Sequence, residues 1–110
     1  MNREFVELAQ FERAWTEMGL GDDALNELED FLREHPKAGD LIPGLGGARK
    51  IRVSMPGRGK SGGGRVIYVD VIFSRRIYLI TAYAKNVQTD LYSEQKKEMR
   101  KLVEYIKREG

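Results

Sequence analysis

Two apolar runs separated by a short polar segment constrain the fold of this chain more than any other feature. Residues 65–73 read RVIYVDVIF and residues 77–83 read IYLITAY, and both are rich in β-branched and aromatic side chains. Ser74, Arg75 and Arg76 lie between them and predict a tight turn that joins two antiparallel strands. Because aliphatic residues occupy both faces of the first run, we expect it to be a central strand.

The remaining segments predict a second set of elements around this pair. Residues 48–55 read as a strand that leads into a glycine-rich loop and completes an antiparallel meander. Residues 4–10 alternate and predict a short first strand. Apolar residues at helical spacing predict a helix over 11–18, a second one that ends before Pro36, and a C-terminal one. Asp22 or Asp23 is the expected cap of the second helix, and Ser93 or Asp90 that of the last.

The predicted order β-α-α-β-β-β-α describes one α+β domain over residues 1–110. We expect a small antiparallel β-sheet with two N-terminal helices and one C-terminal helix packed against one face. Trp15, Phe31 and the apolar stripe of the last helix are expected in the core. No apolar run is long enough to cross a bilayer and the first residues are acidic, so we expect a cytoplasmic protein that does not enter the membrane.

Charge is divided unevenly along the chain. Residues 1–40 hold 4 basic and 11 acidic side chains, whereas residues 41–110 hold 15 basic and 6 acidic ones. A net charge of −7 therefore precedes a net charge of +9, although the whole chain carries only +2. Because the basic half also alternates hydrophobically, it predicts a folded cationic surface that binds a polyanion.

Several kinds of catalytic site are excluded by composition. Cysteine is absent, which excludes disulfides, thiolate zinc sites and cysteine nucleophiles. His35 is the single histidine and its place before Pro36 favours a role at the end of a helix. Most acidic residues lie on the early helices, so paired carboxylates for a metal are hard to assemble. We expect no metal and no cofactor, and any nuclease chemistry is expected to be metal-free.

An acid-free segment between Asp40 and Asp70 contains the candidate phosphate-binding residues. It combines glycines with six bases, namely Arg49, Lys50, Arg52, Arg58, Lys60 and Arg65. A soluble hairpin loop would explain the glycines, but the bases continue into the flanking strands with no acid nearby, which favours phosphate binding. Gly59-Lys60-Ser61 is not a P-loop, because Ser54 stands where that motif needs its first glycine.

Two tyrosines and two arginines complete the candidate set. Tyr83 ends a predicted strand and Tyr92 begins the last helix. Each tyrosine has two possible roles. It is a ligand-contacting residue that stacks on a base or exchanges a proton, or it is a half-buried amphipathic ring with a structural role. Arg75 and Arg76 in the predicted turn are additional candidates for contact with RNA. On the glycine-rich loop, Arg58 and Lys60 are better suited to binding an RNA backbone than to positioning a reacting phosphate.

The spacing of these motifs resembles the HigB-type toxins of the RelE/ParE superfamily. The resemblance rests on residues 44–52 (GLGGARKIR), 62–68 (GGGRVIY) and 83–85 (YAK), and on Asp90-Leu91 before a lysine-rich helix. It implies a toxin of a type II toxin-antitoxin module with the RelE-like, microbial RNase-like fold. It also implies a ribosome-dependent mRNA endonuclease, or mRNA interferase, that inhibits translation by metal-free cleavage of A-site messenger RNA.

By motif position, the resemblance implies catalytic roles for basic residues of the sheet. The matching positions are Lys50, Arg52, Arg65, Lys85 and Tyr92. Lys50 or Lys85 would accept a proton, and Arg52 with Arg65 would stabilise the charge on the phosphorane. Asn86 stands where RelE-like enzymes use an arginine, which differs from the family pattern, and the position of Tyr92 is often not tyrosine in the HigB branch.

Partners and alternatives follow from the same resemblance. It implies a cognate helix-turn-helix antitoxin, HigA-like, and contact with operator DNA only through the complex with that antitoxin. A ParE-like inhibitor of DNA gyrase without nuclease activity stays open as an alternative, because the basic loop and lysine-rich helix allow it. A non-catalytic RNA-binding module is the third hypothesis.

Overall fold

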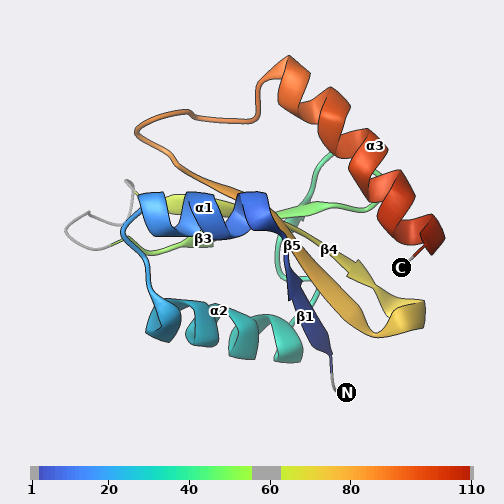
Figure 1. Ribbon diagram of the computed structural model, residues 1–110, viewed down its shortest axis with the longest axis horizontal. Coiled ribbons are helices and arrows are strands. Elements are labelled where there is room, and N and C mark those ends of the chain that lie inside the picture. The colour runs from blue at the N-terminus through green and yellow to red at the C-terminus, as the bar shows by residue number, and fades with distance from the viewer. Residues whose placement is uncertain (1–2, 56–62, 110) are drawn as a thin grey trace.

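A five-stranded sheet forms the centre of the computed structural model, which describes residues 3–55 and 63–109 (Figure 1). The strands lie in the order β1-β5-β4-β3-β2. β4 (Gly64–Val71) and β5 (Arg76–Ala84) pair antiparallel along their whole length, and a 3-10 turn, Ile72–Ser74, joins them. Arg75 completes this connection in the left-handed conformation, with φ 58°. The predicted central position of β4 is confirmed.

The outer strands complete a mixed sheet. β3 (Arg49–Val53) pairs antiparallel with β4, and the two-residue β2 (Asp40–Leu41) pairs antiparallel with β3. β1 (Glu4–Glu7) pairs in parallel with β5, so the sheet is antiparallel only from β2 to β5. The α+β class and the predicted order are confirmed, with β2 as an addition. Neither β2 nor the direction of β1 has a local signal, because both depend on contacts between distant segments.

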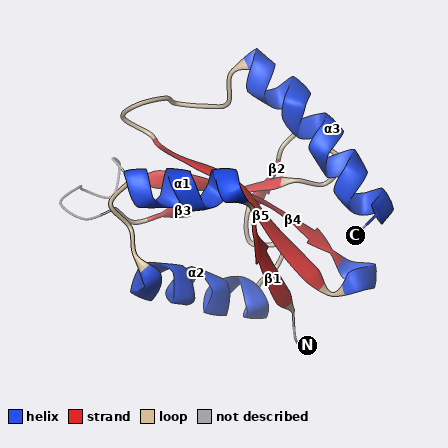
Figure 2. Cartoon of the chain, in the orientation of Figure 1, coloured by secondary structure: helices blue, strands red, loops and turns tan. Residues whose placement is uncertain are grey.

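Helices cover both faces of the sheet, which corrects the expectation that they pack against one (Figure 2). α1 (Ala9–Glu17) and α2 (Asp22–Glu34) pack on one face, where Phe11 and Leu28 share a core with Val66 and Leu79. α3 (Ser93–Glu109) packs on the other, where Val103 belongs to a second core. The physical reason is that β4 and β5 are apolar on both sides, so either face left open would expose apolar surface.

The two aromatic residues expected in the core have different environments. Trp15 is buried and stacks on Phe11 with ring centroids 5.3 Å apart. Phe31 is 47% exposed, so the prediction for this residue is wrong. Its ring lies 5.0 Å from the ring of His35, whereas its neighbour Leu32 is fully buried in the core, so Phe31 points away from the buried face of α2.

Helix ends also differ from expectation. Gly21 is the N-terminal cap of α2, and Asp22 and Asp23 lie within its first turn without a capping side-chain hydrogen bond. Their carboxylates still complement the positive end of the helix dipole. At α3, the Gln95 Oε1 atom accepts from the Tyr92 N–H at 2.8 Å, so a glutamine three residues along the chain satisfies this amide.

The loop before β3, residues 42–48, supports α3 through hydrogen bonds and close packing. Arg100 donates to the Gly44 carbonyl at 2.9 Å, and Lys107 donates to the Gly46 carbonyl at 2.8 Å. Gly46 has φ 63°, and a Cβ atom there would lie 3.1 Å from Val103. Glycine therefore allows both the left-handed turn and the close approach of the helix. α3 is thus fixed over one half of the second face, next to the basic strands.

Candidate functional site

Strand alternation places two bases of β3 on the α3 face of the sheet. Ile51 and Val53 pack against the core beneath α1 and α2. Because successive side chains of a strand point to opposite faces, Lys50 and Arg52 project from the other side. Arg52 is exposed and Lys50 is half-buried, with 29% of its side chain accessible. The alternation therefore puts Lys50 and Arg52 on one face of β3 and Arg49 on the other.

Sheet register brings Arg65 beside this pair. Arg52 lies opposite Arg65, and Arg65 lies opposite Tyr83, so the three residues form a row across β3, β4 and β5. Directly opposed side chains have Cβ atoms about 5 Å apart. Arg65 donates to the Gly64 carbonyl at 3.0 Å, and in the described ranges no carboxylate pairs with Arg52 or Arg65. Two adjacent guanidinium groups without a counter-ion can bind the oxygens of one phosphate.

Lys85 follows β5 at the same end of the sheet. Its backbone N–H donates to the Gly63 carbonyl at 3.0 Å, which fixes the chain beside the start of β4. The side chain is half-buried. Arg52, Arg65 and Lys85 thus gather where the glycine-rich loop joins the sheet, as the sequence predicted.

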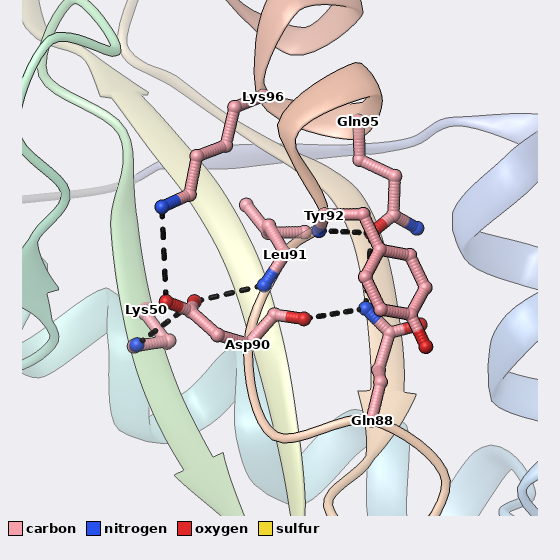
Figure 3. Close-up of polar contacts among 7 residues, drawn as sticks. All are labelled: Lys50, Gln88, Asp90, Leu91, Tyr92, Gln95 and Lys96. Carbon is pink, nitrogen blue, oxygen red and sulfur yellow. Dashed lines mark hydrogen bonds and ion pairs between the residues drawn. The ribbon is translucent and has the colours of Figure 1, made fainter.

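The carboxylate of Asp90 lies between two lysines, Lys50 of β3 and Lys96 of α3 (Figure 3). The Asp90 Oδ1 atom is 3.4 Å from Lys50 Nζ, and Oδ2 is 3.7 Å from Lys96 Nζ. Oδ1 also accepts from the Leu91 N–H at 2.8 Å. This backbone hydrogen bond, followed by the two ammonium groups, lowers the pKa of Asp90 below its ordinary value, although slight burial opposes the shift. Asp90 is therefore a stable anion in an otherwise cationic site.

The two tyrosines of the candidate set have opposite environments. Tyr83 is 6% exposed, and its hydroxyl is buried without a hydrogen-bond partner among the residues described. Burial is the main cause of its raised pKa, Asp90 adds to the rise, and Arg65 opposes it. Tyr92 is 58% exposed, and its ring lies on the Gln88 side of the loop, away from the Asp90 carboxylate (Figure 3). Tyr83 is a core residue, and Tyr92 is accessible to a ligand.

Other predicted binding residues lie apart from this cluster. Arg49 donates to the carbonyls of Lys37 and Gly39, at 3.2 and 2.8 Å, and thereby holds the loop after α2. Arg75 and Arg76 lie at the opposite end of β4 and β5, about 20 Å along the strands from Arg65. Arg58 and Lys60 lie outside the described residues. The structure therefore does not bring Arg49, Arg75 or Arg76 together with the row of Arg52 and Arg65.

Sequence reasoning missed the part that Asp90 and Lys96 play in the site. Asp90 was expected only as a helix cap, and Lys96 was not singled out. Lys50 and Asp90 are 40 positions apart, so their pairing has no local signature. The one available signal is that Asp90 is a rare acid in a basic half of the chain.

An apolar hollow lies beside the same edge of the sheet. Its volume is about 860 Å³, and it lies between α2 and the outer edge of β3. Leu28, Phe31 and Met55 line it together with Lys50 and Arg52. The half-exposed ring of Phe31 is thus part of the wall of this hollow.

No helix of residues 3–55 or 63–109 is both long and apolar enough to span a membrane. Within those ranges, no three histidine, aspartate or glutamate side chains gather as a possible metal site.

Fold and charge together define a class, that of small α+β proteins with a cationic face on a mixed sheet between helices. The family model described as "RelE toxin of RelE / RelB toxin-antitoxin system" matches residues 6–109, so the chain belongs to the RelE toxin family. A solved structure of a mutant of the E. coli toxin RelE in the free state is similar, with a TM-score of 0.58 and 22% sequence identity. The match covers 90% of this chain and 99% of that one, and it supports the RelE-like fold.

Membership in this family gives the chain the general character of a toxin from a toxin-antitoxin system, and it implies an antitoxin partner. The resemblance predicted from the sequence is confirmed at the level of the RelE superfamily.

Proposed function

We propose that this protein is a HigB-type toxin that inhibits translation by cutting messenger RNA in the ribosomal A site. The observation that carries the proposal is the row of Arg52 and Arg65 on the α3 face, flanked by Lys50 and Lys85. Both guanidinium groups lack a carboxylate partner in the described part of the chain, so they are available to a phosphate. Membership in the RelE toxin family supports the same reading.

The proposed reaction is attack by a ribose 2′-hydroxyl on the adjacent phosphorus. The O2′–P bond forms and the P–O5′ bond breaks, which leaves a 2′,3′-cyclic phosphate and a free 5′-hydroxyl. Arg52 and Arg65 stabilise the negative charge of the phosphorane through charge-assisted hydrogen bonds. Lys85 or Lys50, as the neutral amine, accepts the proton of the nucleophile and passes a proton to the departing O5′ atom. Tyr92 contacts the RNA from the start of α3.

Dependence on the ribosome follows from what the site lacks. His35, the single histidine, lies at the end of α2, which packs on the face of the sheet opposite the row, so no imidazole supplies fast proton transfer there. The two guanidinium groups of the row bind a phosphate well but orient the 2′-hydroxyl poorly. The ribosome supplies that alignment when it holds the message in the A site.

The proposed partner is a HigA-like helix-turn-helix antitoxin, and the complex of the two would bind operator DNA. If the antitoxin covers the row of bases, the segment that does so is expected to be acidic, because it must neutralise Arg52 and Arg65. We place the protein in the cytoplasm, where ribosomes and messages are found.

The proposal is tested by adding the purified protein to a translating extract and mapping the 5′ ends of the messages. We expect cuts at A-site codons, and at least a 100-fold loss of the cleavage rate in Arg65→Ala, in line with the loss of one charge-stabilising group. Arg13→Ala is the matched control, because it removes the same charge from α1 on the opposite face. Intact messages with continuing translation would refute the proposal, and intact messages with broken DNA would select gyrase as the target. Strong RNA binding without toxicity would select the non-catalytic module.

A further inference from the structure

Asp90 occupies a position in which a phosphate could replace it. Its carboxylate faces two ammonium groups, Lys50 and Lys96, and a backbone N–H, that of Leu91. These are the donors that commonly bind a phosphate oxygen. All three groups converge on the Asp90 carboxylate (Figure 3). Lys50 lies two positions before Arg52 on the same face of β3.

We propose that Asp90 is a built-in counter-ion that competes with RNA phosphate for Lys50 and Lys96. The inference rests on the proposed function only in that RNA is the ligand of this face. In the free protein the carboxylate pairs with both lysines and offsets one of their two charges, while Arg52 and Arg65 have no carboxylate partner among the described residues. Asp90 thus limits the affinity of the site for any free RNA without removing the two arginines that bind the reacting phosphate.

The geometry explains why this competition can be resolved by a ligand. Asp90 is half exposed, with 52% of its side chain accessible, and Lys96 is 42% accessible. Ion pairs that are this exposed are weak, because water screens both charges. A phosphate held in register by the ribosome can displace the carboxylate, whereas a freely diffusing RNA gains less from doing so.

The surrounding charges favour the same role. Asp40 is exposed and lies opposite Lys50 in the register of β2 and β3, but no ion pair joins them. Gln88 and Gln95 on the other side of the loop are neutral and hydrogen-bond to each other at 3.0 Å. Asp90 is therefore the one carboxylate paired with Lys50 among the residues that the structure describes.

The decisive variant is Asp90→Asn. The amide oxygen of asparagine can still accept from the Leu91 N–H, so the variant removes the charge and keeps the hydrogen bond that orders the loop. Glu104→Gln is the matched control. It removes the same charge from an exposed position of α3, about 16 Å further along the helix than Ser93.

Binding is measured with a fluorescent single-stranded RNA in which every ribose is 2′-O-methylated, so that cleavage cannot occur. We expect Asp90→Asn to bind this probe about fivefold more tightly than the wild type at low salt. The slope of log affinity against log salt should steepen by about 0.7 for each lysine released. The control should match the wild-type slope.

A second substitution separates competition from a general charge effect. Lys96→Gln should have little effect on RNA binding when Asp90 is present, and should remove part of the gain in the Asp90→Asn background. Equal affinities and slopes for Asp90→Asn and Glu104→Gln would overturn the inference. So would weaker binding by Asp90→Asn, which would make Asp90 a residue that positions Lys50. This assay contains no ribosome, so its outcome is independent of whether the protein cuts messages.

Discussion

The hydroxyl of Tyr68 is the most informative single group for the stability of the sheet edge that carries Lys50. Tyr68 is fully buried on β4, and its Oη atom donates to the Pro36 carbonyl at 2.8 Å. The same oxygen accepts from the Gly39 N–H at 3.0 Å. Gly39 is buried and precedes β2, which pairs with Lys50 and Arg49 of β3. The substitution Tyr68→Phe removes both hydrogen bonds without changing the ring.

The expected cost follows from what is left unpaired. The buried N–H of Gly39 loses its partner, which costs about 1–2 kcal/mol. The Pro36 carbonyl lies in a half-buried loop where water can reach it. The loss of its hydrogen bond with Tyr68 therefore costs only about 1 kcal/mol. The variant should therefore unfold with a free energy about 2–3 kcal/mol lower, and with a Tm roughly 8–12 °C lower.

Urea unfolding followed by circular dichroism measures this change, with Tyr78→Phe as the matched control. Tyr78 is also a tyrosine of the sheet with little exposure, but its hydroxyl makes no hydrogen bond among the described residues. The control should lie within about 0.5 kcal/mol of the wild type. A loss below about 1 kcal/mol in Tyr68→Phe, or an equal loss in the control, would show that the hydroxyl does not secure this edge.

Two further predictions concern buried polar groups. Tyr83→Phe should raise the free energy of unfolding by about 1 kcal/mol in the same urea assay, because the Tyr83 hydroxyl is buried without a partner in the described ranges; a loss of stability would contradict this. Burial, and next a hydrogen bond with Glu7, raise the pKa of Glu29 to about 8, from 4.5 in the unfolded chain. The folded state therefore holds a proton that the unfolded state releases. The stabilisation that the Glu29 carboxyl gives the folded state is complete below pH 4.5 and is lost as pH rises through about 8. The difference in free energy of unfolding between pH 6 and pH 9, measured by urea titration, should be smaller for Glu29→Gln than for the wild type. Equal differences would refute the raised pKa of Glu29.

Much of the fold was predictable because its signals are local. Continuous apolar runs predicted β4 and β5 as an adjacent pair, and the helical stripe predicted α3. The face covered by the helices was not predictable in the same way. Val66 and Ile67 are neighbours in sequence but belong to cores on opposite faces. An apolar pattern on both sides of a strand shows that both faces are covered, but it does not say which helix covers which.

In the candidate site, too, local patterns predicted some features, whereas others depend on tertiary contacts. That Lys50 and Arg52 share a face follows from the two-residue period of a strand, and Arg65 joins them once the meander is recognised. Tyr83 and Tyr92 were open from the sequence, and their environments depend on how α3 and its preceding loop pack. Arg49 carries the same charge as its neighbours, yet it binds backbone carbonyls, because it points to the other face of β3.

The class of the domain, the uneven charge along the chain and the shared strand face of Lys50 and Arg52 all follow from the amino-acid sequence. These properties depend on periodicities of two and about four residues, which backbone geometry imposes within each element. The tertiary structure alone decided that β1 joins the sheet in parallel, that α3 covers the face opposite α1 and α2, and that Asp90 meets Lys50. Such contacts join segments 40 or more positions apart. Their free energy comes from packing the whole chain, so no local pattern encodes them.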